Sequence, residues 1–421
     1  MSAITLDPKL LERVNGAIAD IRAGKMVILV DDEDRENEGD LCMAAEFVTA
    51  EAINFMATHG RGLICVTLTE EQIERLGLPM MQAPGRGGPP LGTAFTVSVE
   101  ARHGVTTGIS AADRAYTTRL VASPVCRPED LVTPGHVFPL KARKGGVLVR
   151  TGQTEGSVDL ARLAGLTPAG VICEIMNEDG SMARMPDLEQ FAQKHGLRIL
   201  TIAELIQYRL QTERLVRRVS EKKLVLDETR TEWNAYVYES ATDGRQFLTL
   251  VKGEISSEQP TLCRMHGGSL VGDLFSSTRR EGGRNLREAI ARIESEKCGI
   301  VVYLPGRCAL AEDLEAHRIE PLATPSTKDP LREFGLGAQV LYDLGARKLR
   351  LLTNSPRKIA GIRGFGLDVV ESIPLVSMGP VRPLERSESS DRIDEDAVSK
   401  TPVNGEANHR GDSRGTGKGH A

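Results

Sequence analysis

Ten residues near the N-terminus place the strongest constraint on how this chain folds. The segment Asp31–Asp40 carries seven carboxylates and directly follows the apolar run Met26–Val30. Carboxylates this close together repel one another unless a cation joins them, such as a divalent metal or the single arginine of the run, Arg35. Apolar residues resume at Leu41–Ala45, so the acidic run is predicted to connect two strands. A generic acidic run is most often a solvated turn, but the embedded arginine and the flanking strands favour a functional loop.

Composition excludes several classes of function. The 421 residues carry a formal net charge of -5, which provides no general attraction to nucleic acid or to an anionic membrane surface. No stretch approaches the roughly 18 uninterrupted apolar residues of a membrane span. The seven cysteines are odd in number and contain no Cys-x-x-Cys pair, which argues against a disulfide framework and against a zinc knuckle. We therefore expect a cytoplasmic protein that binds neither nucleic acid nor membrane and holds any phosphate at a local site.

A second candidate site follows a predicted strand at Gly146–Arg150. The next residues, Thr151–Thr154, include a glycine and lead into an apolar pattern typical of a helix that ends at Gly165. The start of a helix after such a turn exposes backbone N–H groups that bind anions. The side chains of Arg150 and Thr154 would complete the site, so the sequence predicts that an anion binds here.

A third candidate is the single carboxylate of the predicted strand Val171–Met176. Glu174 stands in an otherwise apolar run. A glutamate in the middle of a strand is often only the solvent-facing residue of an alternating pattern, yet here the neighbours on both sides are apolar. The residues alone leave the structural and the functional interpretation of Glu174 open.

The order of predicted elements divides the chain into four parts. Helices and strands alternate over residues 1–211, which is typical of an α/β (α+β) domain with a mixed sheet. A strongly charged segment, residues 212–230, is interpreted as a linker. Short alternating strands over residues 231–380 predict a second α+β domain. Residues 381–421 contain almost no apolar side chains, so we expect a disordered tail there.

Three motifs connect the candidate sites to a known family. The segments Asp31–Asp40, Arg150–Leu160 and Glu174–Gly180 closely resemble 3,4-dihydroxy-2-butanone 4-phosphate synthase of riboflavin biosynthesis, and the likeness covers about residues 8–208. The resemblance implies conversion of D-ribulose 5-phosphate to L-3,4-dihydroxy-2-butanone 4-phosphate and formate, by metal-assisted enolisation, rearrangement and loss of one carbon. It also implies Mg²⁺ or Mn²⁺ as the cofactor and a homodimer with a shared active site.

The resemblance further implies a role for each matching residue. The metal ligands would be Glu36 and Gln153, and the proton-transfer residues would be His136 and Glu174. A single histidine is more often structural than catalytic, so the resemblance alone supports a catalytic His136. The implied substrate-binding residues are Arg35, Glu36, Asp40, Arg150, Thr151, Gly152, Gln153, Thr154 and Glu174.

Position 153 departs from the family pattern. The family's second protein metal ligand is usually a histidine in the turn that corresponds to Thr151–Thr154, which is called the phosphate turn below. This chain has Gln153 at that position. A glutamine carbonyl oxygen still binds magnesium, directly or through a water molecule. We therefore expect the activity to survive with a weaker affinity for the metal.

The second domain resembles GTP cyclohydrolase II over about residues 231–379. The matching segments are Arg264–His266, Val271–Phe275, Arg332–Gln339 and Leu352–Lys358. Three cysteines bind zinc in that family, and the matching residues here are Ser269, Arg280 and Gly282. A hydroxyl, a permanent cation and a hydrogen atom cannot form a tetrahedral thiolate site. We therefore expect no zinc and no GTP cyclohydrolase activity in a domain that keeps its fold.

Three interpretations of the whole chain follow. The first is a synthase with one activity and a degenerate cyclohydrolase II-like domain. The second is a bifunctional enzyme that also hydrolyses GTP, which the lost cysteines disfavour. In the third, the second domain is a regulatory module that binds a nucleotide or a partner enzyme of the riboflavin pathway through residues such as Thr353 and Lys358. The first and third interpretations are compatible with each other.

Overall fold

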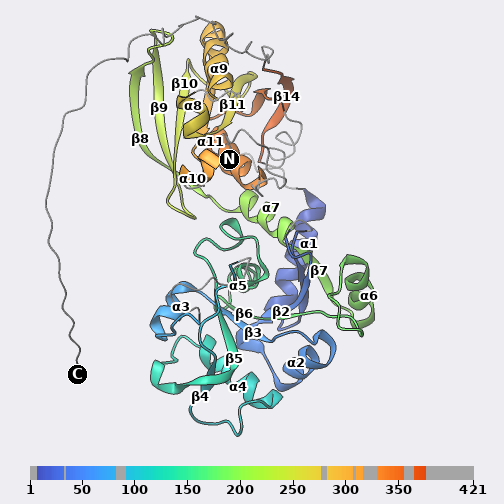
Figure 1. Cartoon of the computed structure of the whole chain (residues 1–421). Helices are drawn as coiled ribbons and strands as arrows, with labels where there is room; N and C mark the ends of the chain where they lie inside the picture. The colour runs from blue at the N-terminus through green and yellow to red at the C-terminus, as the bar shows by residue number, and fades with distance from the viewer. Residues whose placement is uncertain are drawn as a thin grey trace, which may run out of the picture. The chain divides into compact units, whose positions relative to one another are not determined.

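The fold contains two mixed β-sheets, each with helices on its faces (Figure 1). The computed structural model describes residues 7–32, 35–81, 92–275, 282–306, 310–315, 330–354 and 365–375. The expected tail at residues 381–421 and the expectations for Arg280 and Lys358 lie outside these residues. Among the described helices, none is long and apolar enough to cross a membrane.

The first sheet has the strand order β4-β5-β3-β6-β2-β1-β7. Its strands are β1 (Val27–Val30), β2 (Gly39–Ala44), β3 (Cys65–Leu68), β4 (Val99–Ala101), β5 (Leu131–Lys141), β6 (Ala169–Glu174) and β7 (Arg198–Thr201). The pairs β1–β7 and β3–β5 are parallel, and the pairs β1–β2, β2–β6, β3–β6 and β4–β5 are antiparallel. The mixed sheet predicted for this domain is therefore confirmed.

Helices cover both faces of the first sheet. One face packs against α1 (Pro8–Arg22), α5 (Gln153–Leu163) and α7 (Ile202–Thr212), and the other packs against α2 (Ala50–Phe55), α3 (Glu70–Arg75), α4 (Ala111–Ala122) and α6 (Met185–His195). Successive residues of β1 point to opposite faces of the sheet. Leu29 packs in the core on the face covered by α1, α5 and α7, and Ile28 packs in the core on the other face. This explains why β1 is apolar throughout rather than alternating.

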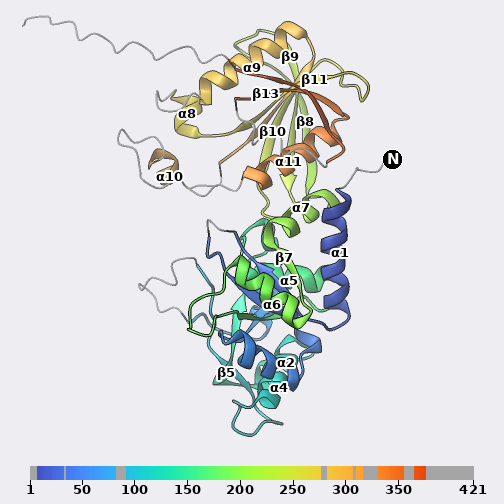
Figure 2. The same ribbon diagram turned by 90° about the vertical axis from the view of Figure 1, so that its right-hand side faces the viewer.

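The second sheet has the strand order β14-β13-β11-β12-β10-β9-β8. Its strands are β8 (Val216–Val225), β9 (Glu232–Ser240), β10 (Gln246–Lys252), β11 (Thr261–Gly267), β12 (Gly299–Leu304), β13 (Lys348–Leu352) and β14 (Asp368–Ile373). The described helices of this part are α8 (Leu270–Leu274), α9 (Gly282–Glu296), α10 (Leu310–Glu315) and α11 (Pro330–Asp343). Figure 2 shows α9 and α11 on opposite faces of the sheet, where they contribute to separate apolar cores. The second mixed α/β domain is thus also confirmed.

The charged segment between the two sheets differs from the expected linker. We predicted a linker over residues 212–230, whereas Val216–Val225 form β8 and pair antiparallel with β9. β8 lies at the edge of its sheet, and most of its side chains are exposed. Charged side chains on an edge strand prevent it from pairing with other chains. A strand of this kind has the composition of a linker, which is why the sequence pattern misled us.

Candidate active site

The acidic run forms the connection between β1 and β2. The two strands pair as far as Val30 and Gly39, which closes the loop at its base. Asp31 is buried at the start of the loop and accepts hydrogen bonds from the backbone N–H groups of Glu36 (3.2 Å) and Glu38 (2.8 Å). The carboxylate of Asp31 therefore shapes the loop from within.

Arg35 is the cation that the crowded carboxylates require. Its Nη1 atom donates to Asp31 Oδ2 at 2.5 Å and to Glu36 Oε2 at 2.7 Å. The same nitrogen donates to Gln153 Oε1 at 3.0 Å, at the start of α5. The two expected metal ligands, Glu36 and Gln153, therefore meet at one guanidinium nitrogen although they are far apart in the sequence.

Asp40 and Glu174 lie directly opposite each other on the neighbouring strands β2 and β6. Asp40 is buried, and burial raises its pKa well above the ordinary value for an aspartate. The negative charge of Glu174 raises the pKa of Asp40 further, as does that of Glu36. A carboxyl whose pKa is raised by burial beside a second carboxyl is suited to proton transfer, because its protonated form is favoured.

Gly62 allows the chain to pass close to Glu174. A Cβ atom at position 62 would lie 2.5 Å from both the backbone oxygen and Oε2 of Glu174. Only glycine fits at this distance. The close approach lets the next N–H group, that of Leu63, donate to Glu174 Oε2 at 2.8 Å. The orientation of this carboxylate is therefore set by the backbone before β3.

The loop carries more negative than positive charge. Burial raises the pKa of Glu38, and the charge of Glu36 raises it further, while Arg184 acts in the opposite direction. Arg184 stands at the start of α6 and donates to the backbone oxygens of Glu36 (2.7 Å) and Asn37. The carboxylates gathered around this loop are Asp31, Glu36, Glu38, Asp40 and Glu174. A divalent cation would offset part of this excess charge.

The side chains present fit a hard cation. A carboxylate and an amide oxygen, here from Glu36 and Gln153, are the kind of ligands that Mg²⁺ and Mn²⁺ accept. Among the described residues, no group of three or more His, Cys, Asp or Glu side chains is arranged to hold a metal by itself. Such an ion would therefore take its remaining ligands from substrate and water, as Mg²⁺ commonly does.

The predicted strand before the phosphate turn is wrong. Residues Gly146–Leu148 form a 3₁₀ turn instead. Gly145 and Gly146 have φ angles of 92° and 63°, in the left-handed region that strands do not use. The adjacent glycines are the sequence signal for a turn, because only glycine enters this region without strain. The apolar run Val147–Val149 outweighed that signal in the strand prediction.

The start of α5 nevertheless keeps the features of an anion site. Its N-cap residue, Gly152, has no side chain to occupy the first N–H groups of the helix. Arg150 donates from Nη1 to Glu155 Oε2 at 2.7 Å, which places its guanidinium beside the turn. Gln153 and Thr154 are buried in the first turn of the helix. A phosphate bound here would lie close to the Glu36–Gln153 pair.

Comparison with known proteins identifies the family. The family model for 3,4-dihydroxy-2-butanone 4-phosphate synthase matches residues 15–208, and the model for GTP cyclohydrolase II matches residues 217–374. The riboflavin biosynthesis protein RibBA of Aquifex aeolicus is 50% identical and covers 86% of this chain and 92% of its own length. A 3,4-dihydroxy-2-butanone 4-phosphate synthase of Pseudomonas aeruginosa is 49% identical and covers 86% of this chain and 99% of its own length. The chain belongs to the 3,4-dihydroxy-2-butanone 4-phosphate synthase family.

A solved structure of the synthase family extends over both sheets. The crystal structure of RibBX, a two-domain 3,4-dihydroxy-2-butanone 4-phosphate synthase from A. baumannii, is 41% identical to this chain with a TM-score of 0.70. It covers 86% of this chain, and the match covers 99% of that structure. The two-domain arrangement of this chain is therefore shared with a solved synthase of the family.

One expected catalytic residue of the synthase lies apart from the others. His136 is on β5 and Glu174 is on β6, with β3 between the two strands. His136 Nδ1 lies 2.8 Å from Glu100 Oε2, and the histidine side chain is 45% exposed. In the described part of the chain, His136 makes no hydrogen bond or ion pair with Glu174. The structure thus brings the acidic loop, the end of β6 and the start of α5 together at one site, and His136 lies outside this group.

Sequence reasoning missed two residues that orient site groups. Glu100 is the partner of His136, which is 36 positions away, and Arg184 holds the backbone at Glu36 from 148 positions away. Neither residue belongs to a motif that the sequence resemblance used. A contact across such separations leaves no local pattern, so only the fold reveals it.

In the cyclohydrolase II-like domain, Ser269, which matches a zinc-binding cysteine of the GTP cyclohydrolase II family, has a structural role. Ser269 caps α8, and its hydroxyl accepts a backbone N–H of that helix at 3.0 Å. The Ser269 N–H in turn donates to Asp273 at 2.9 Å. Asp273 also accepts from Tyr303 at 2.9 Å and pairs with the buried His266 at 3.0 Å. These contacts form a polar cluster built without a thiol.

Proposed function

We propose that this chain converts D-ribulose 5-phosphate to L-3,4-dihydroxy-2-butanone 4-phosphate and formate, the reaction of the synthase family. The carbon, hydrogen, oxygen and phosphorus atoms of the substrate equal those of the ketose phosphate plus formic acid, so the reaction needs no net co-substrate. The observation that carries the proposal is the meeting of Glu36 and Gln153 at Arg35. This meeting point joins the acidic loop, with its Asp40–Glu174 pair, to an anion-binding helix start.

The role of each group follows from its position. The first N–H groups of α5 and the guanidinium of Arg150 bind the phosphate. Glu36 and Gln153 would hold Mg²⁺ or Mn²⁺, which when bound supplies polarisation of the carbonyl and hydroxyl oxygens of the sugar. His136 and Glu174 transfer protons between carbon and oxygen atoms during enolisation, and Asp40, whose pKa is raised, adds a proton donor beside Glu174.

Formate release by the purified full-length chain tests this proposal. We expect formate from ribulose 5-phosphate in the presence of Mg²⁺ or Mn²⁺, and loss of the activity when the metal is removed with a chelator. Absence of formate across a wide range of both metals would refute the synthase assignment.

The proposal extends to a homodimer in the cytoplasm whose two copies share each site. An exposed His136 that is oriented by Glu100 but does not contact its own Glu174 supports a site completed by a second copy. Co-expression of two inactive variants, His136→Asn and Glu36→Gln, tests this. In a shared site, mixed dimers contain one intact site and recover part of the activity, whereas separate sites recover none.

We also propose that the second domain does not hydrolyse GTP. The use of the Ser269 hydroxyl as a helix cap supports this, because a capping hydroxyl does not replace a zinc-binding thiolate. Stoichiometric zinc in the purified protein, or a pyrimidine product from GTP, would contradict the proposal. Co-purification with other riboflavin enzymes tests separately whether the domain binds a pathway partner.

A further inference from the structure

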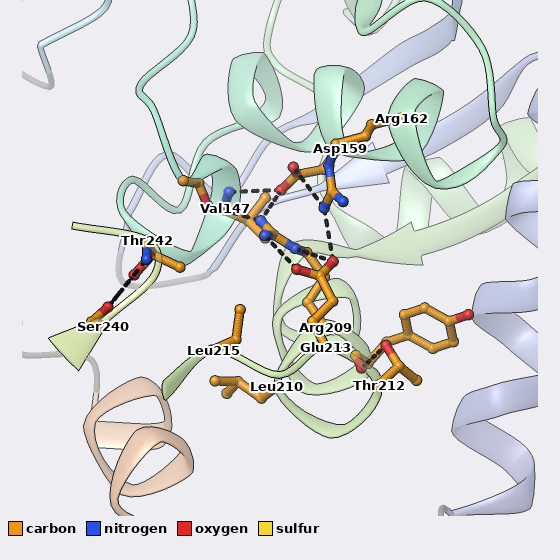
Figure 3. A network of polar contacts seen from close by, with 12 residues as sticks. Val147, Asp159, Arg162, Arg209, Leu210, Thr212, Glu213, Leu215, Ser240 and Thr242 are labelled. Carbon is orange, nitrogen blue, oxygen red and sulfur yellow. Dashed lines mark hydrogen bonds and ion pairs between the residues drawn. The ribbon is translucent and has the colours of Figure 1, made fainter. Parts of the chain in front are cut away.

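A buried ion-pair network connects α7 to residues 143–150, the segment that leads into the phosphate turn (Figure 3). Asp159 of α5 is 3% exposed and accepts from the N–H of Val147 at 2.9 Å. Arg209 of α7 is 4% exposed and donates from Nη1 to Asp159 Oδ2 at 2.7 Å. The same Nη1 donates to the backbone oxygen of Gly145 at 2.8 Å. One guanidinium nitrogen therefore holds both the carboxylate and the backbone of the segment.

The path of this segment depends on the network. A Cβ atom at position 146 would lie 2.2 Å from Asp159 Oδ2, so the backbone of Gly146 passes directly over the carboxylate. Burial raises the pKa of Asp159, and the charge of Arg209 opposes that shift. A buried carboxylate that loses its cation must take up a proton or move. Either change alters the acceptor that fixes the N–H of Val147.

The other end of the segment is held by the same helix. Glu155, one turn before Asp159 on α5, accepts the N–H of Arg143 at 3.0 Å and the Nη1 of Arg150 at 2.7 Å. The backbone from residue 143 to residue 150 is thus attached to α5 by two buried carboxylates. The N–H of Arg150, the last residue of that stretch, donates to the backbone oxygen of Gly146 at 3.1 Å, which links Arg150 to the backbone that the network holds.

We propose that Arg209 is a positioning residue of the synthase: it fixes the backbone at Gly145 and the carboxylate of Asp159 so that Arg150 and the start of α5 face the substrate phosphate. This inference rests on the proposed function for the identity of the substrate. Arg209 is itself oriented by Glu213, which accepts its Nε and its Nη2, both at 2.9 Å. Its guanidinium therefore makes four hydrogen bonds, which go to two carboxylates and one carbonyl.

The variant Arg209→Gln tests the inference. We expect the KM for ribulose 5-phosphate to rise about tenfold while kcat changes less than about twofold, since the phosphate contacts are misplaced and the proton-transfer groups are not. Hydrogen exchange should become faster at the N–H groups of Val147 and Arg150. Arg209→Lys should give an intermediate KM, because one ammonium group cannot reach all three acceptors.

Arg162 provides a matched control. It contacts the same two carboxylates, Glu213 at 2.8 Å and Asp159 at 3.6 Å, but its side chain is 42% exposed. In the described structure it makes no hydrogen bond to the backbone of residues 143–150. Arg162→Gln should therefore keep the KM and the exchange rates of the parent, whereas a mere need for charge balance at Asp159 would make the two variants alike.

A double variant keeps the test decisive if Arg209→Gln fails to fold. Arg209→Gln with Asp159→Asn leaves no buried carboxylate without a cation at position 159, yet the oxygen of Gly145 still loses its arginine donor. We expect its KM and its exchange at Val147 to be raised. Parent values for both in the folded double variant would overturn the inference. Formate release by the parent chain is scored separately, and the exchange result is valid whatever that assay shows.

Discussion

Replacing Asp40 with asparagine is expected to stabilise the protein while it disables the synthase reaction. Asp40 and Glu174 are directly opposite each other on β2 and β6, and Asp40 is buried. Asparagine has nearly the same shape and carries no charge, so it removes the repulsion without leaving a cavity. It also cannot transfer a proton, so we expect formate release to fall by about 100-fold or more.

The size of the gain follows from the geometry of the pair. Residues directly opposite in an antiparallel pair have Cβ atoms about 5 Å apart. Two unit charges at that distance repel by roughly 3 kcal/mol when the effective dielectric constant is near 20. Asp40 escapes part of this repulsion by binding a proton. We therefore expect Asp40→Asn to raise the free energy of unfolding by about 1–3 kcal/mol at neutral pH, and Tm by about 2–4 °C per kcal/mol.

The gain depends on pH with a definite sign. A carboxyl whose folded-state pKa is raised contributes stability that is complete below its unfolded pKa and is lost as the pH rises through the folded pKa. Asp40 is such a group. Asparagine does not titrate, so the advantage of the variant should be absent near pH 4 and grow as the pH rises. Urea unfolding of both proteins at several pH values between about 4 and 8 measures this difference.

Asp113 offers a control of opposite sign. The hydroxyl of Thr106 donates to its carboxylate at 2.7 Å and is the main cause that lowers its pKa, with backbone N–H groups such as that of Gly108 adding to it. Asp113→Asn should therefore destabilise the protein at neutral pH, and the loss should shrink as the pH falls through the lowered pKa. If Asp113→Asn shows its loss and Asp40→Asn shows no gain at about pH 8, the argument from opposed carboxylates is refuted.

Three further substitutions probe the same site. Glu36→Gln should abolish formate release even at high magnesium, because it removes the only anionic metal ligand expected from the protein. Near-normal turnover would refute the assignment of Glu36 as a metal ligand. Gln153→His restores the usual family ligand and should lower the magnesium concentration for half-maximal activity by about tenfold; an unchanged requirement would mean that position 153 does not bind the metal. Gly62→Ala should reduce activity at least tenfold because its Cβ would meet Glu174 at 2.5 Å, while Gly267→Ala, with no atom within 4 Å, should be silent in the same assay.

The sequence predicted those parts of the site whose cause is local. A strand on each side of the acidic run was enough to predict its loop, and β1 and β2 confirm it. The helix predicted to follow the turn Thr151–Thr154 is confirmed by α5, which begins at Gln153, although the strand predicted before it was wrong. A strand that is buried on both faces appears in the sequence as an uninterrupted apolar run. The short apolar run Val147–Val149 was therefore predicted to be a strand, whereas the structure has a buried 3₁₀ turn at Gly146–Leu148.

Contacts between distant segments were not predictable from one sequence. Arg184, Glu100 and Arg209 each act on a group at least 36 positions away. Their own surroundings are ordinary: Arg184 begins a helix, and Arg209 lies in the last turn of another. An arginine in such a place is usually solvated, and only the fold shows that two of these three side chains hold a backbone oxygen near the proposed site.

The acidic run itself shows how burial divides residues that look alike in a sequence. Arg35 pairs with Asp31 and Glu36, so one arginine accounts for two of the crowded carboxylates. Asp31 is already committed to the backbone of the loop, whereas Asp40 faces another carboxylate across the sheet. Repulsion between carboxylates is therefore relieved by Arg35 at the start of the run, and it remains at the end of the run, between Asp40 and Glu174. A loop that only needed to be stable would place a cation beside Asp40 as well. Besides burial, the charges of Glu174 and Glu36 both raise the pKa of Asp40, so that end of the loop stays electronegative. This is the arrangement expected of a site that gains its missing positive charge from a metal ion.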